Sequence, residues 1–427
     1  MSTTKKASDY PSVVVVGGGA AGMMAAIRAA ENGARVTLFE PNDRLGRKLR
    51  ITGKGRCNLT NDCDRDEFLT NVPTNPRFLY AALAAMEPAD TKAFFENLGV
   101  PLKTERGKRV FPVSDHADDV ADALGRRCRE LGVTVRRVRV EKPLIRDGRA
   151  VGVLTSDGEI PANAVIVCTG GRSYPKTGSG GDGYRMAREV GHTVTELRPS
   201  LVPLVEEGNI CAELQGLSLR NVALRVVNRE NGKTVYDDFG ELLFTHFGLS
   251  GPTVLSASAA LSDVLPGRYE VWIDLKPALD EKKLDERLLS DFAKYANRDF
   301  ANALDDLLPQ KMIEPMIRLS GIDPRKKVHS VTKEERGRLV AWFKCFRVPL
   351  RGTRPIDEAI VTRGGVNVRE IDPKSMESRK VKGLYFAGEV LDVDAYTGGF
   401  NLQIAFSTGA LAGLHAARDA ADVPDSK

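Results

Sequence analysis

A glycine pattern near the start of the chain has the residue types and spacing of a site for a dinucleotide. Gly17-x-Gly19-x-x-Gly22 follows a β-branched run that begins at Ser12 and opens a helical stretch, and a second β run ends at Glu40. The glycines let the backbone approach a pyrophosphate, the helix N-terminus offers unpaired N–H groups, and Glu40 can accept ribose hydroxyls. Because a carboxylate would repel a 2′-phosphate, this unit predicts FAD or NAD and disfavours NADP.

A second glycine-rich match, Gly178-x-Gly180-x-x-Gly183, lies in the stretch RSYPKTGSGGDGY. Pro175 and polar residues precede these glycines, where a dinucleotide-binding unit would have a β-strand. The match therefore predicts a loop that contacts the cofactor or the substrate. It does not predict a second dinucleotide-binding fold.

The segment from Asp43 to Asn61, DRLGRKLRITGKGRCNLTN, is rich in cations: Arg44, Arg47, Lys48, Arg50, Lys54 and Arg56. A loop that leaves the strand ending at Glu40 must pass near the bound dinucleotide, so we expect these cations to meet phosphate. The alternative is a solvated basic loop. Cys57 lies among the cations, which would lower the pKa of its thiol and make it a usable acid or nucleophile; the alternative is a buried, unreactive cysteine.

The remaining elements indicate one dinucleotide-binding domain with a large insertion. The runs Ala164–Cys168 and Gly383–Ala387 are typical of buried parallel strands, and each ends in polar or glycine residues, Thr169-Gly170 and Gly388-Glu389. Between them, short β-like runs from about residue 196 to 277 are followed by a helical pattern from about 280 to 346. An Ala-rich helix over residues 401–419 is expected to close the first domain.

Composition excludes several classes of protein. The 427 residues are 42% apolar and 28% charged with a net charge of +5, as in ordinary folded proteins. The six cysteines form no CxxC pair, so we expect no metal site and no disulfide framework. The longest apolar stretch, residues 13–27, holds four glycines and is too short to cross a membrane. The N-terminal MSTTKKASDYP lacks the features of a signal peptide, so a cytoplasmic location is expected.

Five stretches together resemble one family: VVVVGGGAAG, GRKLRITGKGRCNLTN, TGGRSYPKTGSGGDGY, GELLFTHFGLSGP and GLYFAGEVLDVDAYTGGFNLQIAFSTG. They resemble the BaiN/RdsA family of NAD(P)/FAD-dependent oxidoreductases, which also holds aminoacetone-oxidase-like flavoproteins. The resemblance implies an α/β fold with a glutathione-reductase-like, FAD-binding Rossmann domain built from residues 1–195 and 347–427. It also implies a β-barrel-like insert over 196–279, a helical insert over 280–346, and FAD as the resident dinucleotide.

The resemblance further implies the residues that hold FAD. The pyrophosphate would meet Gly17, Gly19, Ala21 and Gly22, and the adenosine ribose would meet Glu40. Val138 is the expected adenine contact, with Val135 or Val140 as alternatives. The remaining phosphate and the flavin would meet a set drawn from the basic loop and the two late strand ends: Arg47, Lys48, Gly53, Cys57, Asn58, Thr169, Gly170, Gly388 and Glu389.

Two further features concern the flavin ring. The run Gly399, Phe400, Asn401 and Leu402 starts a helix whose N-terminal dipole would stabilise negative charge on the reduced isoalloxazine. His246, in LLFTHFGLSGP, is expected either as a proton donor or substrate partner, beside Cys57 as the second catalytic candidate, or as a structurally satisfied histidine. Tyr174, Asp394 and Tyr396 are additional candidates.

The family resemblance leaves several activities open. The leading hypothesis is a reductase that passes hydride from flavin N5 to a carbonyl-conjugated C=C bond of uridine in 23S ribosomal RNA, giving dihydrouridine. A small enone such as a dehydro bile acid is the second substrate. An oxidase of a small amine such as aminoacetone, and an RNA-binding protein with a structural flavin, are the rivals. NAD(P)H is the expected electron donor, docking transiently.

Charge placement favours RNA. The segment from Lys311 to Arg354 contains twelve Lys and Arg residues and four Asp and Glu residues, which gives it a net charge of +8. Trp342, Phe343 and Phe346 lie among them as possible stacking surfaces for bases. The alternative is a soluble helical face with aromatic residues in its core.

Overall fold

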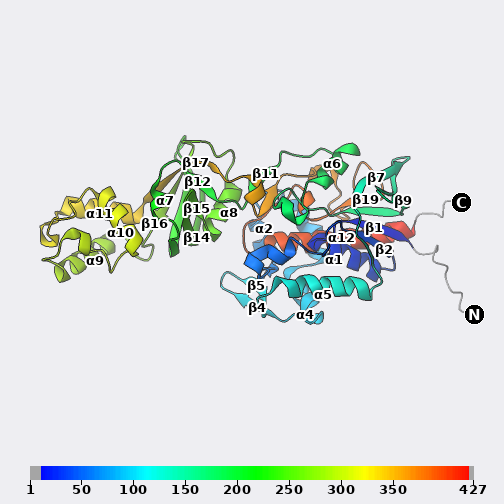
Figure 1. The fold of residues 1–427 in the computed structure, drawn as a ribbon, viewed down its shortest axis with the longest axis horizontal. Coiled ribbons are helices and arrows are strands. Elements are labelled where there is room, and N and C mark those ends of the chain that lie inside the picture. The colour runs from blue at the N-terminus through cyan, green and yellow to red at the C-terminus, as the bar shows by residue number, and fades with distance from the viewer. Residues whose placement is uncertain (1–10, 423–427) are drawn as a thin grey trace, which may run out of the picture. The chain divides into compact units, whose positions relative to one another are not determined.

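A computed structural model describes residues 11–422 and divides the chain into two units (Figure 1). Unit 1 comprises Met1–Ser200 and Ile356–Lys427, and unit 2 comprises Leu201–Pro355. The N-terminal stretch on which the absence of a signal peptide was argued lies outside the described residues, apart from its last residue. Within residues 11–422, no helix combines the length and the apolar character needed to span a membrane.

Unit 1 is built on a five-stranded sheet in the order β19-β10-β1-β2-β6, in which every neighbouring pair is parallel. Its strands are β1 (Ser12–Val16), β2 (Arg35–Phe39), β6 (Thr134–Arg136), β10 (Ala164–Val167) and β19 (Leu384–Phe386). The central strands are almost wholly buried, which explains their continuous β-branched sequence. Parallel pairing places the carboxyl ends of all five strands at one edge.

Helices and three small sheets complete unit 1. The helices are α1 (Ala20–Glu31), α2 (Arg65–Thr70), α3 (Tyr80–Ala85), α4 (Pro88–Asn97), α5 (Ala117–Glu130), α6 (Asp182–Glu189) and α12 (Phe400–Ala421). The small sheets contain β3 (Thr60–Asn61), β4 (Leu102–Glu105) and β5 (Arg109–Pro112); β7 (Val140–Arg146), β8 (Arg149–Thr155) and β9 (Gly158–Pro161); and β11 (Arg198–Ser200) with β18 (Val361–Arg363).

Helix α12 packs directly on helix α1, as Figure 1 shows at the centre of unit 1. Two glycines of α12 permit this: a Cβ on Gly409 would lie 2.4 Å from the carbonyl oxygen of Ala21, and one on Gly413 would lie 2.3 Å from that of Ala25. The close contact sets the first two turns of α1 against the middle of α12.

Unit 2 contains a closed six-stranded barrel in the order β12-β15-β14-β13-β16-β17. The strands are β12 (Leu204–Glu206), β13 (Ser218–Asn228), β14 (Thr234–Thr245), β15 (Gly248–Ser250), β16 (Tyr269–Asp274) and β17 (Phe346–Thr353). Its helices are α7 (Ile210–Glu213), α8 (Pro252–Ala260), α9 (Glu281–Lys294), α10 (Gln310–Ser320) and α11 (Lys333–Lys344). Barrel and helices share one hydrophobic core.

The expected α/β fold, with a Rossmann-type sheet, a barrel insert and a helical insert, is confirmed. One boundary needs correction, because strand β17 lies in the barrel, paired with β12 and β16, whereas the sequence assigned residues from 347 onward to the FAD-binding domain. Phe346, Val348 and Leu350 of this strand are buried in the core of unit 2. The barrel is therefore closed by a strand that follows the helical insert.

Candidate functional site

The glycines of the first motif shape the turn between β1 and α1. A Cβ on Gly17 would lie 2.5 Å from the carbonyl oxygen of Cys168, and one on Gly22 only 1.8 Å from that of Gly17. By contrast, a Cβ on Gly19 would have no atom within 4 Å, so space is open before the α1 N-terminus. Ala21 is buried beneath Gly388, where a side chain on that glycine would clash with it. This cradle of close-packed glycines around an open helix N-terminus fits a pyrophosphate.

Glu40 is held in place at the end of β2. Its carboxylate accepts hydrogen bonds from the backbone N–H of Gly18 (2.8 Å), from the N–H of Asn42 (2.9 Å) and from the Asn42 side chain (2.7 Å). Val138 lies just beyond β6, the neighbour of β2, and is half-buried against the core. The structure thus brings the expected ribose and adenine residues to the same edge; Asn42 was not anticipated from the sequence.

Lys48 and Glu389 form an ion pair across the carboxyl edge. Lys48 Nζ lies 2.7 Å from Glu389 Oε2 and also donates to Ser173 Oγ (2.8 Å). Glu389 Oε1 accepts in addition from Ser173 Oγ (3.1 Å) and from the N–H of Thr362 (2.9 Å). Thr362 gave no signal in the sequence, because it lies in a short strand remote from every motif.

Most of the cations in the basic loop are committed to carboxylates of unit 1. Arg44 and Arg50 pair with Asp118 and Asp122 of α5, and Arg56 pairs with Glu105 and Asp115. Arg47 is exposed and donates to Asn42 Oδ1 (3.1 Å). The expectation that the loop as a whole presents its charge to phosphate is therefore wrong for Arg44, Arg50 and Arg56, while Arg47 and Lys48 remain near the edge.

The segment from Gly53 to Asn58 adjoins the start of α12. Gly53 has φ 57° and lies in a turn of left-handed residues. With its amide oriented so that both ends are satisfied, Asn58 accepts from the N–H of Gly399 (3.0 Å) and donates to the carbonyls of Thr60 and Val110. Gly399 has φ 99°, and a side chain there would strike the carbonyl of Thr60.

Asn401 organises the loop before α12. Its side chain accepts from the N–H of Ala395 (3.0 Å) and donates to the carbonyl of Ala395 (2.8 Å). Phe400 is buried with its ring against Phe68 (5.2 Å between centroids), and Leu402 is half-buried. The helix N-terminus at Gly399 is therefore held firmly, as a site for developing negative charge requires.

Cys57 fits the second of its two sequence-based interpretations, the buried and unreactive cysteine. Its side chain is fully buried, and burial raises the pKa of the thiol to about 12, despite a hydrogen bond with Thr52 that lowers it. The neighbouring cation Arg56 points to Glu105 and Asp115 instead. The hypothesis of an activated thiolate is wrong, because desolvation outweighs the nearby charge.

The two late strand ends meet at the same edge. Thr169 and Gly170 follow β10, and the Thr169 hydroxyl is buried without a hydrogen-bond partner in the described part of the chain. The N–H of Gly388, after β19, donates to Thr408 Oγ1 of α12 (2.9 Å). A buried hydroxyl without a partner is unusual in a finished core and is common where a ligand completes the site.

The remaining candidates lie in different settings. His246 is exposed on the turn between β14 and β15 of unit 2, with its ring against Phe247. Tyr174 is half-buried with φ 50°. Asp394 is fully buried, accepts from Ser200 Oγ (2.6 Å), and has its pKa raised by burial; burial also raises the pKa of Tyr396. The roles expected for these residues stay predictions.

The basic run Lys311–Arg354 is partly paired with carboxylates. Several of its cations pair with carboxylates, some from outside the run: Arg318 with Glu213, Lys326 with Glu335, Lys327 with Asp299, Arg336 with Asp285, and Lys344 with Asp274. Unit 2 as a whole has 23 Lys and Arg against 22 Asp and Glu, a net charge of +1. Phe343 and Phe346 are fully buried and cannot stack on bases, so the charge argument for RNA is corrected.

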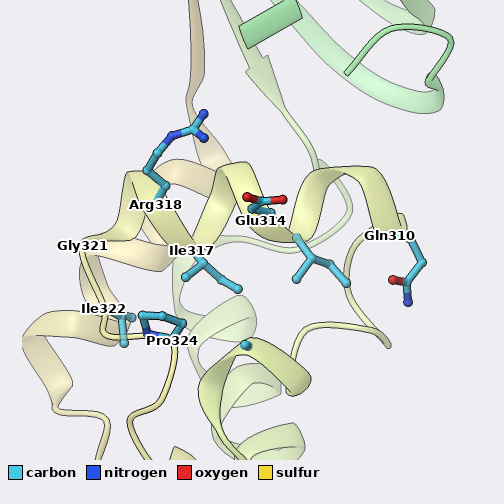
Figure 2. A pocket seen from close by; sticks show the side chains of 9 residues that line it. Gln310, Glu314, Ile317, Arg318, Gly321, Ile322 and Pro324 are labelled. Carbon is cyan, nitrogen blue, oxygen red and sulfur yellow. The ribbon is translucent and has the colours of Figure 1, made fainter. Parts of the chain in front are cut away.

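A groove of about 600 Å³ in unit 2 lies along α10 (Figure 2). Ile317 of α10 points toward Ile322 and Pro324, while Arg318 points away from them (Figure 2). The groove contains no feature of a dinucleotide site. Among residues 11–422, no group of three His, Cys, Asp or Glu side chains is placed to hold a metal ion.

Comparisons with known proteins agree with this geometry. Residues 11–415 match the model of the HI0933-like protein Rossmann domain. The chain is 32% identical to a 3-dehydro-bile acid delta(4,6)-reductase of Clostridium scindens over 94% of this chain and 98% of that protein. It is 33% identical to a ribosomal RNA dihydrouridine synthase of Escherichia coli over 92% of this chain and 95% of that protein.

A solved structure shows the same fold at low identity. The 3-ketosteroid delta1-dehydrogenase of Sterolibacterium denitrificans has a TM-score of 0.51 and 16% identity, covering 96% of this chain and 100% of that chain. The resemblance to BaiN/RdsA oxidoreductases is confirmed by the family match and by the full-length relatives. The chain therefore belongs to the HI0933-like family and is an FAD-dependent oxidoreductase.

Proposed function

We propose that this FAD-dependent oxidoreductase reduces a C=C bond conjugated to a carbonyl, and that its substrate is uridine in 23S ribosomal RNA. Both curated relatives support the reaction type, because a delta(4,6)-reductase of a 3-oxo compound and a dihydrouridine synthase each saturate such a bond. The observation that carries the choice of RNA is that two nearly full-length relatives, from Escherichia coli and Haemophilus influenzae, are ribosomal RNA dihydrouridine synthases. The charge of unit 2 adds no support.

FAD is proposed to lie along the carboxyl edge of the unit 1 sheet. Its pyrophosphate would rest on Gly17, Gly19, Ala21 and Gly22, with Glu40 on the ribose and Val138 on the adenine. The flavin half would meet residues from the other strand ends, the basic loop and the start of α12: Arg47, Lys48, Gly53, Cys57, Asn58, Thr169, Gly170, Gly388, Glu389, Gly399, Phe400, Asn401 and Leu402. The supporting observation is the open space at Gly19 among otherwise close-packed glycines.

When bound, FAD supplies a hydride from N5 to the β-carbon of the conjugated bond. The chain must bind the carbonyl compound, exclude water and provide a proton for the α-carbon. His246 is the stronger proton donor of the two catalytic candidates, because it is exposed whereas the Cys57 side chain is fully buried. The backbone at the α12 N-terminus would stabilise negative charge near the reduced ring.

The test begins with the purified protein under anaerobic conditions. We expect NADH or NADPH to bleach the flavin absorbance, and unmodified 23S ribosomal RNA to restore it, with dihydrouridine detected by mass spectrometry of the digested RNA. Absence of dihydrouridine with either donor, and with dithionite-reduced enzyme, would refute the RNA substrate.

Two further arms separate the alternatives. A second substrate, a 3-oxo-delta-4 bile acid, is favoured by the similarity to the Clostridium scindens reductase, and its saturation without any reaction on RNA would identify that activity. Flavin reduction by aminoacetone followed by reoxidation in air would instead identify an amine oxidase. Flavin that neither NAD(P)H nor amines reduce would favour an RNA-binding protein with a structural flavin.

A matched pair of variants tests the proton donor. His246→Gln is expected to lower kcat about 100-fold or more, as for loss of a general acid. His329→Gln is the control, because His329 is another exposed histidine of unit 2, whose Nδ1 hydrogen-bonds the carbonyl of Ala296. Equal activity of both variants would remove His246 from the mechanism.

A further inference from the structure

The two-residue turn between β14 and β15 in unit 2 consists of ring-bearing residues. His246 and Phe247 connect Thr245 to Gly248, which pair directly across the hairpin. Turns of this length usually contain Asn, Asp or Gly with positive φ, yet neither His246 nor Phe247 has a positive φ. The Thr245 side chain holds the turn instead, because its hydroxyl donates to the carbonyl of Gly248 (2.9 Å). The folding of the hairpin therefore does not explain the two rings.

The half-buried ring of Phe247 forms a pair with a cation from the end of the barrel. The guanidinium carbon of Arg354 lies over this ring, 4.7 Å from its centroid, and the ring of His246 meets it in a T-shaped contact at 5.0 Å. The backbone of both partners is tied to β12 and the residue before it. The N–H of Glu206 donates to the carbonyl of Phe247, and the N–H of Arg354 donates to the carbonyl of Pro203, each at 3.0 Å. The Phe247–Arg354 pair is thus held in place by the barrel.

Another cation–ring pair of the barrel has an ordinary structural explanation. Arg347 lies over the ring of Trp272 (5.1 Å), but these two residues are direct cross-strand partners in β17 and β16. The Trp272 Nε1–H also donates to Glu270 of the same strand (2.6 Å). Cross-strand pairs of this kind stabilise a sheet. Phe247 and Arg354 are not strand partners, since one lies in a turn and the other follows the last residue of β17, so the sheet does not account for their contact.

The charges next to β12 favour an anionic partner. Strand β17 has a bulge opposite Val205 and Glu206, and its extra residue is the exposed Arg351. Bulges commonly redirect a side chain. The acidic residue of β12, Glu206, is buried, and its carboxylate accepts hydrogen bonds from the N–H groups of Ile210 (3.0 Å) and Cys211 (2.8 Å). Its charge is therefore satisfied inside the protein, while Arg351 remains on the surface.

A partly exposed ring beside a planar guanidinium is a surface on which nucleobases stack, because every base has a flat π-face. The guanidinium also has N–H donors for the carbonyl groups of a base. We propose that the Phe247–Arg354 pair is a stacking platform for an unpaired base of the RNA substrate. This inference rests on the proposed function, the reduction of uridine in ribosomal RNA. Stacking does not require a high net charge, so the platform is compatible with the nearly neutral unit 2.

The test measures binding of unmodified 23S ribosomal RNA to the FAD-loaded full chain, by filter binding at several salt concentrations. Phe247→Leu is expected to weaken binding about five- to hundredfold, the effect of losing one base stacked on an aromatic ring. The slope of log Kd against log salt should stay unchanged, because no phosphate contact is lost. Phe247→Tyr should bind as the wild type does, since it keeps the ring. Arg354→Lys should also weaken binding, because lysine keeps the charge but has no plane on which a base can stack.

Phe239→Leu is the matched control, because Phe239 is an exposed phenylalanine of β14, the strand that leads into the turn. Equal RNA affinities of Phe247→Leu and Phe239→Leu would overturn the inference, as would weak binding by Phe247→Tyr, which would show a structural role. A smaller salt slope in Phe247→Leu, or wild-type affinity in Arg354→Lys, would also overturn it. A wild-type enzyme that neither binds this RNA nor forms dihydrouridine in it would instead overturn the proposed function itself.

Discussion

Gly22 and Gly19 make a pair of positions at which the same substitution should have opposite consequences. In Gly22→Ala the new methyl would start 1.8 Å from the carbonyl oxygen of Gly17, about 1.6 Å short of ordinary van der Waals contact at 3.4 Å. The first turn of α1 must move away from β1 to admit it. Overpacking of this kind costs about 1–3 kcal/mol or more, and alanine's better helix propensity returns about 1 kcal/mol at most.

In Gly19→Ala the methyl meets no atom within 4 Å, and the backbone there has φ −81°, which alanine adopts without strain. The apoprotein should lose less than about 1 kcal/mol, the difference between glycine and alanine at an N-cap. The methyl would nevertheless occupy the open space where the pyrophosphate is proposed to lie. We therefore expect at least a tenfold loss of FAD affinity, with little change in stability.

Urea unfolding of the two apoproteins, followed by FAD titration of each, measures both effects. The expected pattern is a clear loss of unfolding free energy for Gly22→Ala and a selective loss of FAD binding for Gly19→Ala. Wild-type stability in Gly22→Ala would refute the steric argument at the β1–α1 contact. Wild-type FAD affinity in Gly19→Ala would refute the placement of the pyrophosphate.

Three further predictions follow from the ion pairs and the buried thiol. Lys48→Met should lower the unfolding free energy by about 1–3 kcal/mol, because Glu389 loses a charged partner. Adding Glu389→Gln to this variant should recover part of the loss. Additive effects of the two substitutions in a double-mutant cycle, measured by urea unfolding, would contradict the coupling. Iodoacetamide at pH 8 should label the half-buried Cys345 well before Cys57, whose pKa of about 12 keeps the thiol protonated; mass spectrometry showing faster labelling at Cys57 would contradict this. Burial would raise the pKa of Glu370, but hydrogen bonds from Lys380, Thr193 and His192 outweigh it and lower the pKa to about 2. Because the folded-state pKa is lowered, the stability that Glu370 contributes is complete above the ordinary glutamate pKa near 4.5 and disappears as the pH falls toward 2. In urea unfolding, the stability advantage of wild type over Glu370→Gln should therefore shrink between pH 6 and pH 3. A constant difference would contradict this assignment.

The parts of the fold that the sequence predicted are those whose signals are local. The β1–α1–β2 unit could be predicted because a buried parallel strand is a continuous β-branched run and the glycines follow it at fixed spacing. The strands before Gly170 and Gly388 have the same signal. Strand β17 could not be assigned in this way, because Pro349 is untypical of a strand interior and the partners β12 and β16 are remote in the sequence.

The sequence predicted the glycine turns of the site better than the contacts of its charged residues. Glycine is required where neighbouring backbone atoms leave no room for a side chain, whereas the effect of a charge depends on partners that the fold brings from far away in the sequence. Lys48 pairs with Glu389, which is 341 residues away in the sequence, and Arg50 pairs with Asp118, which is 68 residues away. For the same reason the sequence could not decide between the two interpretations of Cys57 or show how the cations between Lys311 and Arg354 are paired, since burial and pairing are properties of the folded chain.

The packing of α12 on α1 has a consequence for the order in which a nascent chain can acquire its cofactor. Strand β19 and helix α12 come after the whole of unit 2 in the sequence, yet they complete the sheet edge and brace the first helix of unit 1 through Gly409 and Gly413. A ribosome must therefore finish the barrel and its helices before the dinucleotide cradle exists. Until then β10 presents an unpaired edge, so the incomplete chain is the form most exposed to misfolding and to proteases, and loading with FAD waits for the late segment.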